Sequence, residues 1–182
     1  MKKNKKEKKD SSEIKWFITI FVTAFILSIV FSFISTTAIE GLSLIPAILV
    51  LLLVIFMGIL FDIIGVAVMV GKESDFNAMA AKKIPGAKTS LSLIKNSEKV
   101  SNICADVVGD VAGVLSGSIA ALIAFNITSE FGLGFNVQFI ISAIVASLTI
   151  GGKAIGKGIA QKNTTKIVGF VGRIVKIFKK EK

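Results

Sequence analysis

The chain has 182 residues, of which 53% are hydrophobic, and it carries a formal net charge of +10. A chain this apolar is not a soluble globule, and the composition predicts an all-α integral membrane protein. The positive charge does not indicate nucleic-acid binding, because the sequence offers no basic, aromatic-rich soluble domain to carry that function.

The lysines and arginines all fall within three regions, residues 2–15, 72–99 and 153–182. The short segments around Glu40 and Glu130 contain none. Cytoplasmic connections of membrane proteins are enriched in Lys and Arg. This alternation therefore predicts a multi-pass protein of the plasma membrane with both termini cytoplasmic.

The amino-terminal part predicts a tail followed by a membrane anchor. Residues 1–15 are lysine-rich and are expected to form a disordered cytoplasmic tail that lies against anionic lipid. Residues 16–36 are long and apolar enough to span the bilayer, with Trp16 as an interfacial anchor. A cleaved signal peptide ending near Thr36 and Ala38 is the alternative, but the apolar run is longer than such peptides usually carry.

Residues 41–160 predict three further transmembrane helices, at about 45–70, 101–126 and 135–157, which makes four spans with the anchor. Pro85 and Gly86 divide the connection at 71–99 into two pieces. Each piece is either a short amphipathic helix on the membrane surface or part of a solvated basic loop. Residues 161–182 form a juxtamembrane tail, in which 164–178 predict a basic amphipathic helix in the cytoplasmic interface.

Acidic residues inside the predicted spans are the main candidates for function. Asp106 and Asp110 are four residues apart and share a helical face, and Asp62 is the only charge in its span. Carboxylates at membrane depth need a partner, a cation or water, which marks functional-site candidates. Asp62 either joins this acidic group or extends toward the lipid headgroups. The glycine-rich end of the last span brings Lys153, and then Lys157, toward the inner membrane edge.

A ladder of small residues lies beside the two aspartates. Its members are spaced by four residues: Ala105, Gly109, Gly113, Gly117 and Ala121. Small side chains at this spacing let another helix approach closely, so the ladder predicts a helix-packing surface.

The available side chains argue against an enzyme. The sequence has no histidine and no tyrosine, and Cys104 is its only cysteine. The commonest general base is therefore absent. Asp106 and Asp110 are a carboxylate pair, but they lie on one helix, whereas intramembrane aspartyl proteases take their acids from two helices. We expect neither catalysis nor a covalently bound cofactor.

Three short motifs, in this order along the chain, resemble motifs of one transporter family. They are Asp62-Ile63-Ile64-Gly65, the segment from Asn96-Ser97-Glu98 to Ala105-Asp106 and Asp110, and Gly152-Lys153-Ala154-Ile155-Gly156-Lys157. Over residues 55–176 the chain resembles the transmembrane domain of the CorB/CorC and CNNM magnesium transporters, diverged and without the CBS domains that usually follow. The resemblance implies a three-helix module, here preceded by one added span, and a homodimer.

The sequence departs from the family's motifs mainly by changes of charge. Asp62 stands in place of a serine, Asp106 and Asp110 stand in place of two asparagines, and Lys153 stands in place of a glutamate. In the family, serine and asparagine oxygens and backbone carbonyls hold the dehydrated ion, which suits a hard cation. The resemblance therefore implies Mg²⁺ as the transported ion.

Two functions follow from these changes. If Asp62, Asp106 and Asp110 face a cavity, they hold a transported Mg²⁺ ion, with Lys153 and Lys157 as gate or competitor. If Lys153 lies among the acids, it replaces the metal and forms an internal ion pair. The chain is then a non-transporting relative that assembles with a separate membrane or regulatory partner. Membrane lipid and a second copy are expected partners.

Overall fold

The computed structural model describes residues 2–39, 42–132 and 136–178, with the side chains of 2–13, 31, 34–36, 38–39 and 136 left out. Over this part the chain is all-helical and contains no strand, as the composition predicts. The elements are α1 (Lys2–Ile39), α2 (Leu44–Val70), α3 (Glu73–Ala81), α4 (Ala87–Lys95), α5 (Ser97–Ser101), the π-helix η1 (Asn102–Val108), α6 (Gly109–Phe131), α7 (Asn136–Lys162) and α8 (Thr164–Phe178). Glu40 and residues 133–135 lie outside the described residues.

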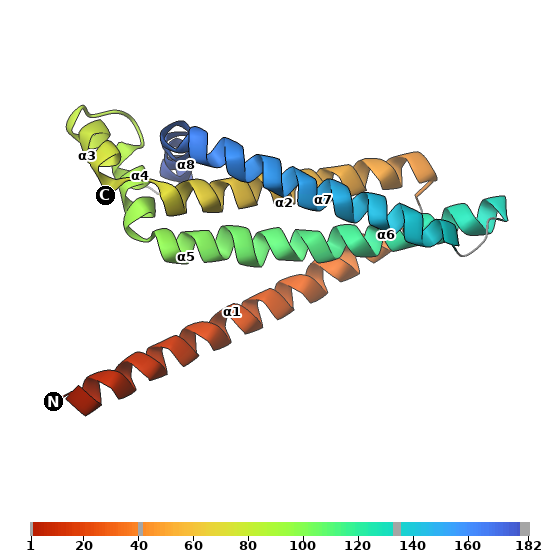
Figure 1. Cartoon of the computed structure of the whole chain (residues 1–182), viewed down its shortest axis with the longest axis horizontal. Coiled ribbons are helices and arrows are strands. Elements are labelled where there is room, and N and C mark those ends of the chain that lie inside the picture. The colour runs from red at the N-terminus through yellow and green to blue at the C-terminus, as the bar shows by residue number, and fades with distance from the viewer. Residues whose placement is uncertain (1, 40–41, 133–135, 179–182) are drawn as a thin grey trace.

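Long helices that alternate in direction along the chain form the bundle in Figure 1. Each is long and apolar enough to cross a membrane: α2, the continuous helix Ser97–Phe131 that comprises α5, η1 and α6, and α7 over Val137–Lys162. In the most apolar stretch of each helix, the buried share of the residues is 50% for the continuous helix, 22% for α2 and 11% for α7. The continuous helix is therefore the central one, and we call it the central helix.

Helix α1 contacts the central helix through η1 and α6 but diverges from the bundle toward its own amino terminus (Figure 1). Lys99 Nζ lies 5.8 Å from the centre of the Trp16 ring, a cation–π contact between the two helices. The apolar part of α1 among the described residues, Ile14–Val30, is shorter than the three helices that are long and apolar enough to cross a membrane. A fourth span over 16–36 therefore stays a prediction.

The start of α1 differs from the prediction of a disordered tail at residues 1–15. The helix begins at Lys2 and continues without a break to Ile39. Lysine and glutamate are good helix formers, and a helix that already exists is extended with one new hydrogen bond for each added residue. The apolar segment that follows therefore supplies the nucleus from which the basic segment becomes helical.

Two apolar cores occupy opposite halves of the bundle. The first comprises Ala47, Leu51, Ile55, Ile119, Ala120, Ile123 and Val145, from α2, α6 and α7. The second comprises Ala67, Val68, Phe76, Ile94, Ala160 and Val168, from α2, α3, α4, α7 and α8. Along the buried face of α2, Gly58, Asp62 and Gly65 lie between the two cores. Asp62 is thus the buried charged side chain of α2, and it lies between two glycines that separate the apolar cores.

Helices α3, α4 and α8 cover the second core at one end of the bundle (Figure 1). The buried Ser90 hydroxyl of α4 lies 3.1 Å from the carbonyl oxygens of Gly86 and Val168, and it can donate its hydrogen to either. Gly86 has a φ of +82°, a left-handed conformation that suits glycine. Helices α3 and α4 lie on either side of Pro85, and α8 spans the residues for which an amphipathic helix is predicted.

Candidate functional site

The polar layer consists of Asp62 of α2, Gly109 and Asp110 of α6, and Lys153 of α7. Glycines bring α2 and the central helix into close contact on both sides of Asp62. A Cβ placed on Gly58 would lie 2.9 Å from the Cβ of Ala112, and one placed on Gly65 would lie 3.0 Å from the Cβ of Ala105. Neither position has room for a side chain without a shift, so these contacts set the register of α2 on η1 and α6.

Asp62 is the buried carboxylate of the layer. Its side chain faces η1, since it lies between the Gly58 and Gly65 contacts on the same face of α2. The residue is 5% exposed, and its Oδ2 atom is buried without a hydrogen-bond partner among the described residues. This burial does not fit a side chain that extends toward the headgroups. Burying an ionised carboxylate oxygen without a hydrogen bond costs free energy, and a cation at this position would offset that cost.

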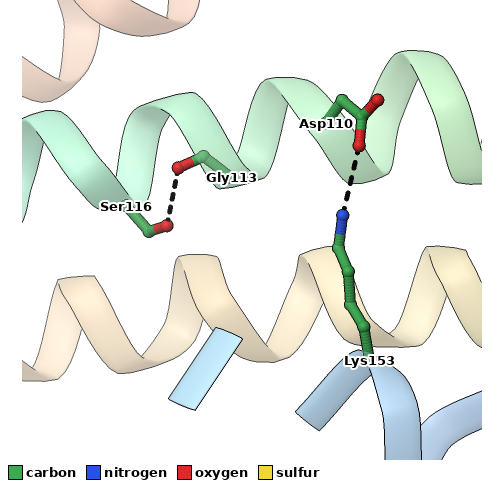
Figure 2. Close-up of polar contacts among 4 residues, drawn as sticks. All are labelled: Asp110, Gly113, Ser116 and Lys153. Carbon is green, nitrogen blue, oxygen red and sulfur yellow. Dashed lines mark hydrogen bonds and ion pairs between the residues drawn. The ribbon is translucent and has the colours of Figure 1, made fainter. Parts of the chain in front are cut away.

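Lys153 and Asp110 form an ion pair across the α6–α7 contact. The Lys153 Nζ atom lies 3.2 Å from Asp110 Oδ1, and Figure 2 shows the extended lysine reaching toward the α6 carboxylate. The lysine side chain is 20% exposed and the aspartate side chain is 73% exposed. A Cβ on Gly109 would lie 3.7 Å from this Nζ atom and 3.8 Å from the Gly58 carbonyl oxygen. The Lys153 ammonium group therefore lies near the place where Gly109 of α6 packs against Gly58 of α2.

The remaining predicted site residues lie on the surface. Asp106 and Lys157 are both exposed. Among the residues that the structure describes, no group of three acidic, cysteine or histidine side chains lies close enough together to hold a metal ion. The structure thus pairs Asp110 with Lys153, keeps Asp62 buried on a neighbouring helix, and does not bring the three carboxylates into one cluster.

The predicted ladder of small residues divides into two parts. Ala105 and Gly109 lie against α2, whereas a Cβ on Gly113 or Gly117 would meet no atom within 4 Å. Gly113 and Gly117 line a groove of about 280 Å³ between α6 and α7, and Lys153 is also part of its lining. Ala121 is half-buried. The second part of the ladder is therefore an open groove within a single copy of the chain.

The π-helix was not expected from the sequence. At its end the Gly109 amide bonds the carbonyl oxygen of Cys104, five residues earlier. This wider turn adds a residue to the helix and changes which side chains face α2, a geometry that recurs at functional sites. No pattern of hydrophobic residues in the sequence predicts such a turn. Gly58 and Gly65, on either side of Asp62, do indicate from the sequence that another helix approaches α2 closely.

No protein-family model matches the chain, and no curated protein or solved structure is significantly similar to it. The resemblance to the CorB/CorC and CNNM magnesium transporters therefore rests on the short motifs alone. Two observations are independent of that resemblance. The Oδ2 atom of Asp62 is buried without a hydrogen-bond partner in the described part of the chain, and an ion pair joins α6 and α7, two helices that pack on α2.

Proposed function

We propose that the chain is a multi-pass membrane protein that transports a cation through its polar layer, with Mg²⁺ as the expected ion. The observation that carries the proposal is the buried Oδ2 atom of Asp62, which has no hydrogen-bond partner in the described part of the chain. Burying an ionised carboxylate alone is costly, so such groups are retained in membrane proteins where a cation meets them. The expectation of magnesium rests on the motif resemblance and on the oxygen chemistry of the layer.

Backbone oxygens supplement the carboxylate in this layer. The carbonyl oxygens of Cys104 and Gly58 lie 3.6 and 3.8 Å from the position that a Gly109 Cβ would take. Because Gly109 has no side chain, the Lys153 ammonium also comes within 3.7 Å of this point. Oxygen ligands suit a hard metal cation, and in this proposal the two carbonyl oxygens assist the carboxylate.

Lys153 acts as a tethered competitor of the ion in this proposal. Its ammonium is paired with Asp110 at 3.2 Å. One carboxylate balances only half the charge of a divalent ion, so an ion at Asp62 needs a second acidic group. Asp110 supplies that group when Lys153 moves away, which couples ion entry to a rearrangement between α6 and α7.

The experiment is Mg²⁺ uptake into proteoliposomes that contain the purified full-length chain and an enclosed Mg²⁺-sensitive dye. We expect Asp62→Asn to lower the initial rate by about tenfold or more, because loss of the ionic ligand costs at least about 1.4 kcal/mol of binding free energy. Glu98→Gln is the matched control, since it removes the same charge from an exposed position of α5. Its rate should stay near that of the wild type.

A wild-type rate equal to that of empty liposomes contradicts transport, provided that the protein is helical by circular dichroism and monodisperse. That result favours the second candidate function. An Asp62→Asn rate equal to an active wild-type rate contradicts the role of Asp62 as the site of the ion.

Assembly with another membrane helix is the second candidate, and an exposed acidic surface favours it. The Asp110 side chain is 73% exposed and Asp106 is also exposed, while Gly113 and Gly117 face open space. Carboxylates at membrane depth do not face acyl chains, and open glycines allow another helix to approach. In this proposal α6 pairs with a second copy, Lys153 holds Asp110 as an internal ion pair, and no ion crosses.

The assembly proposal predicts that Gly117→Ile lowers the dimer fraction of the full chain in nanodiscs by about tenfold, because the added side chain holds the partner helix away. Gly158→Ile is the control, since a Cβ there also meets nothing within 4 Å but lies on α7. Subunit-counting by fluorescence photobleaching measures the fraction. An equal loss in both variants, or no loss in Gly117→Ile, counts against this contact.

A further inference from the structure

Helix α8 carries apolar side chains on two faces. Its inner face, with Val168, Gly169 and Gly172, is buried. Its outer face, defined as Phe170, Ile174, Ile177 and Phe178, is exposed by 64, 40, 79 and 85% respectively. Inner-face contacts account for the docking of α8 on the bundle, so they leave the outer face unexplained. A contiguous exposed apolar face marks an interaction surface.

The outer face is bordered by positive charge. Every charged residue between 164 and 178 is basic. Lys166 and Arg173 line one hollow of about 400 Å³ together with Phe170 and Met79, which we call the α8 hollow. Two cations and two apolar side chains around one hollow match a molecule that has an anionic head and an apolar chain.

The position of α8 places this face at the end of the membrane-crossing bundle. Helix α7 ends at Lys162 and α8 begins at Thr164. Figure 1 shows α8 nearly end-on, whereas α2, α6 and α7 run along the length of the molecule. Helix α8 therefore lies across the bundle end, as a helix in the plane of a leaflet does.

We propose that the α8 outer face and the α8 hollow bind an anionic phospholipid of the adjacent leaflet. Lys166 and Arg173 contact the phosphate of its headgroup, and Phe170, Ile174 and Ile177 lie among the acyl chains. A guanidinium group pairs with phosphate through two parallel hydrogen bonds, and basic residues near an anionic leaflet are attracted to it. A second copy is a poorer fit, because a two-fold contact along this face would place its basic border against the same border.

The experiment uses the full chain in nanodiscs, with Cys104→Ala and Ile177→Cys so that the outer face carries a single fluorescent label. Brominated phosphatidylglycerol and brominated phosphatidylcholine are compared at equal mole fraction as quenchers of the label. We expect quenching by the anionic lipid to be at least about threefold stronger. Lys166→Gln combined with Arg173→Gln should remove this preference while quenching by both lipids persists, which shows that α8 stays at the leaflet.

Lys82→Gln combined with Lys162→Gln is the matched control, because both lysines are exposed and neither lines the α8 hollow. This variant should keep the preference for the anionic lipid. Equal quenching by the two lipids in the unaltered chain overturns the proposal, as does a preference that survives loss of Lys166 and Arg173. Absence of quenching by either lipid assigns the outer face to a second copy or a soluble partner instead. The readout does not involve ion flux, so it is independent of the proposed transport.

Discussion

Lys153 and Asp110 lie in unequal surroundings although they form one ion pair. The lysine side chain is 20% exposed and the aspartate side chain is 73% exposed. Because half of the pair is exposed, its own contribution to stability is small, about 1 kcal/mol or less. On the neighbouring helix, the Oδ2 atom of Asp62 is buried and has no hydrogen-bond partner among the residues that the structure describes. The arrangement therefore leaves the Lys153 ammonium close to α2 and α6, which each carry an acid. This suits a lysine that competes with a cation for the carboxylates more than one that supports the structure.

At the residue scale we predict that Lys153→Met tightens the apparent affinity for Mg²⁺ by roughly fivefold, which corresponds to about 1 kcal/mol. The reason is that the variant removes the tethered competitor and releases Asp110. The concentration dependence of proteoliposome uptake measures this affinity. Lys153→Arg, which keeps the charge, should behave like the wild type. An unchanged affinity in Lys153→Met together with a lower dimer fraction would instead support the structural role of the lysine.

At the scale of elements, the contact between α4 and α8 depends on backbone proximity. A Cβ on Gly86 would lie 2.8 Å from the Arg173 amide nitrogen and 2.9 Å from its Cα atom. The Ser90 hydroxyl joins the same contact through the Val168 carbonyl. Because the obstructing atoms belong to the backbone of α8, they cannot move away as a side-chain tip can. The short helices at this end therefore form one unit, held by small residues.

We predict that Gly86→Ala lowers the free energy of unfolding by about 2 kcal/mol or more, since alanine is strained at positive φ and its Cβ displaces α8. Hydrogen exchange of the full chain in nanodiscs should then become faster in α8 but not in α2. Gly158→Ala provides the comparison, because it lies in α7 and its Cβ would meet nothing within 4 Å. Unchanged protection of α8 in Gly86→Ala would show that this contact does not hold the helix.

At the scale of the whole molecule, the chain is a bundle with two different ends. One end carries α3, α4 and α8, and the other carries the start of α2 and the end of α6 (Figure 1). The three long helices are each apolar enough to cross a membrane. The basic residues of 72–99 and 153–178 lie on elements toward the first end, and from the positive-inside rule we expect this end to face the cytoplasm.

This orientation predicts opposite accessibility for two exposed positions. In a Cys104→Ala background, a membrane-impermeant maleimide added to intact cells should label Ser43→Cys, which precedes α2. It should label Asn163→Cys, between α7 and α8, only after the cells are permeabilised. Three membrane crossings between the two positions would place them on opposite sides. Labelling of both positions from the same side would therefore contradict the three-span arrangement.

Local features of the sequence were sufficient to predict most of the helices. The apolar runs of α2, α6 and α7, the break at Pro85 and Gly86, and the spacing in α8 each depend on residues within a few turns of one another. The candidate site was predicted only in part. Asp62 and Lys153 belong to the polar layer, but Asp106 and Lys157 are exposed. A shift of one residue in helical phase, as at η1, redirects a side chain by about 100°.

The sequence by itself determined that the chain is helical, that it is apolar enough for a membrane, and that its three most apolar long helices carry Asp62, Asp106 and Asp110. Hydropathy and helix propensity are properties of neighbouring residues. Only the tertiary structure decided which charges meet. Lys153 and Asp110 are 43 positions apart, and their contact depends on how α7 and α6 are turned about their axes. Gly58 and Gly65 set the corresponding register for α2, which leaves Asp62 buried against η1 instead of joining the pair. Packing of small residues, more than attraction between charges, therefore selected the arrangement of the polar layer.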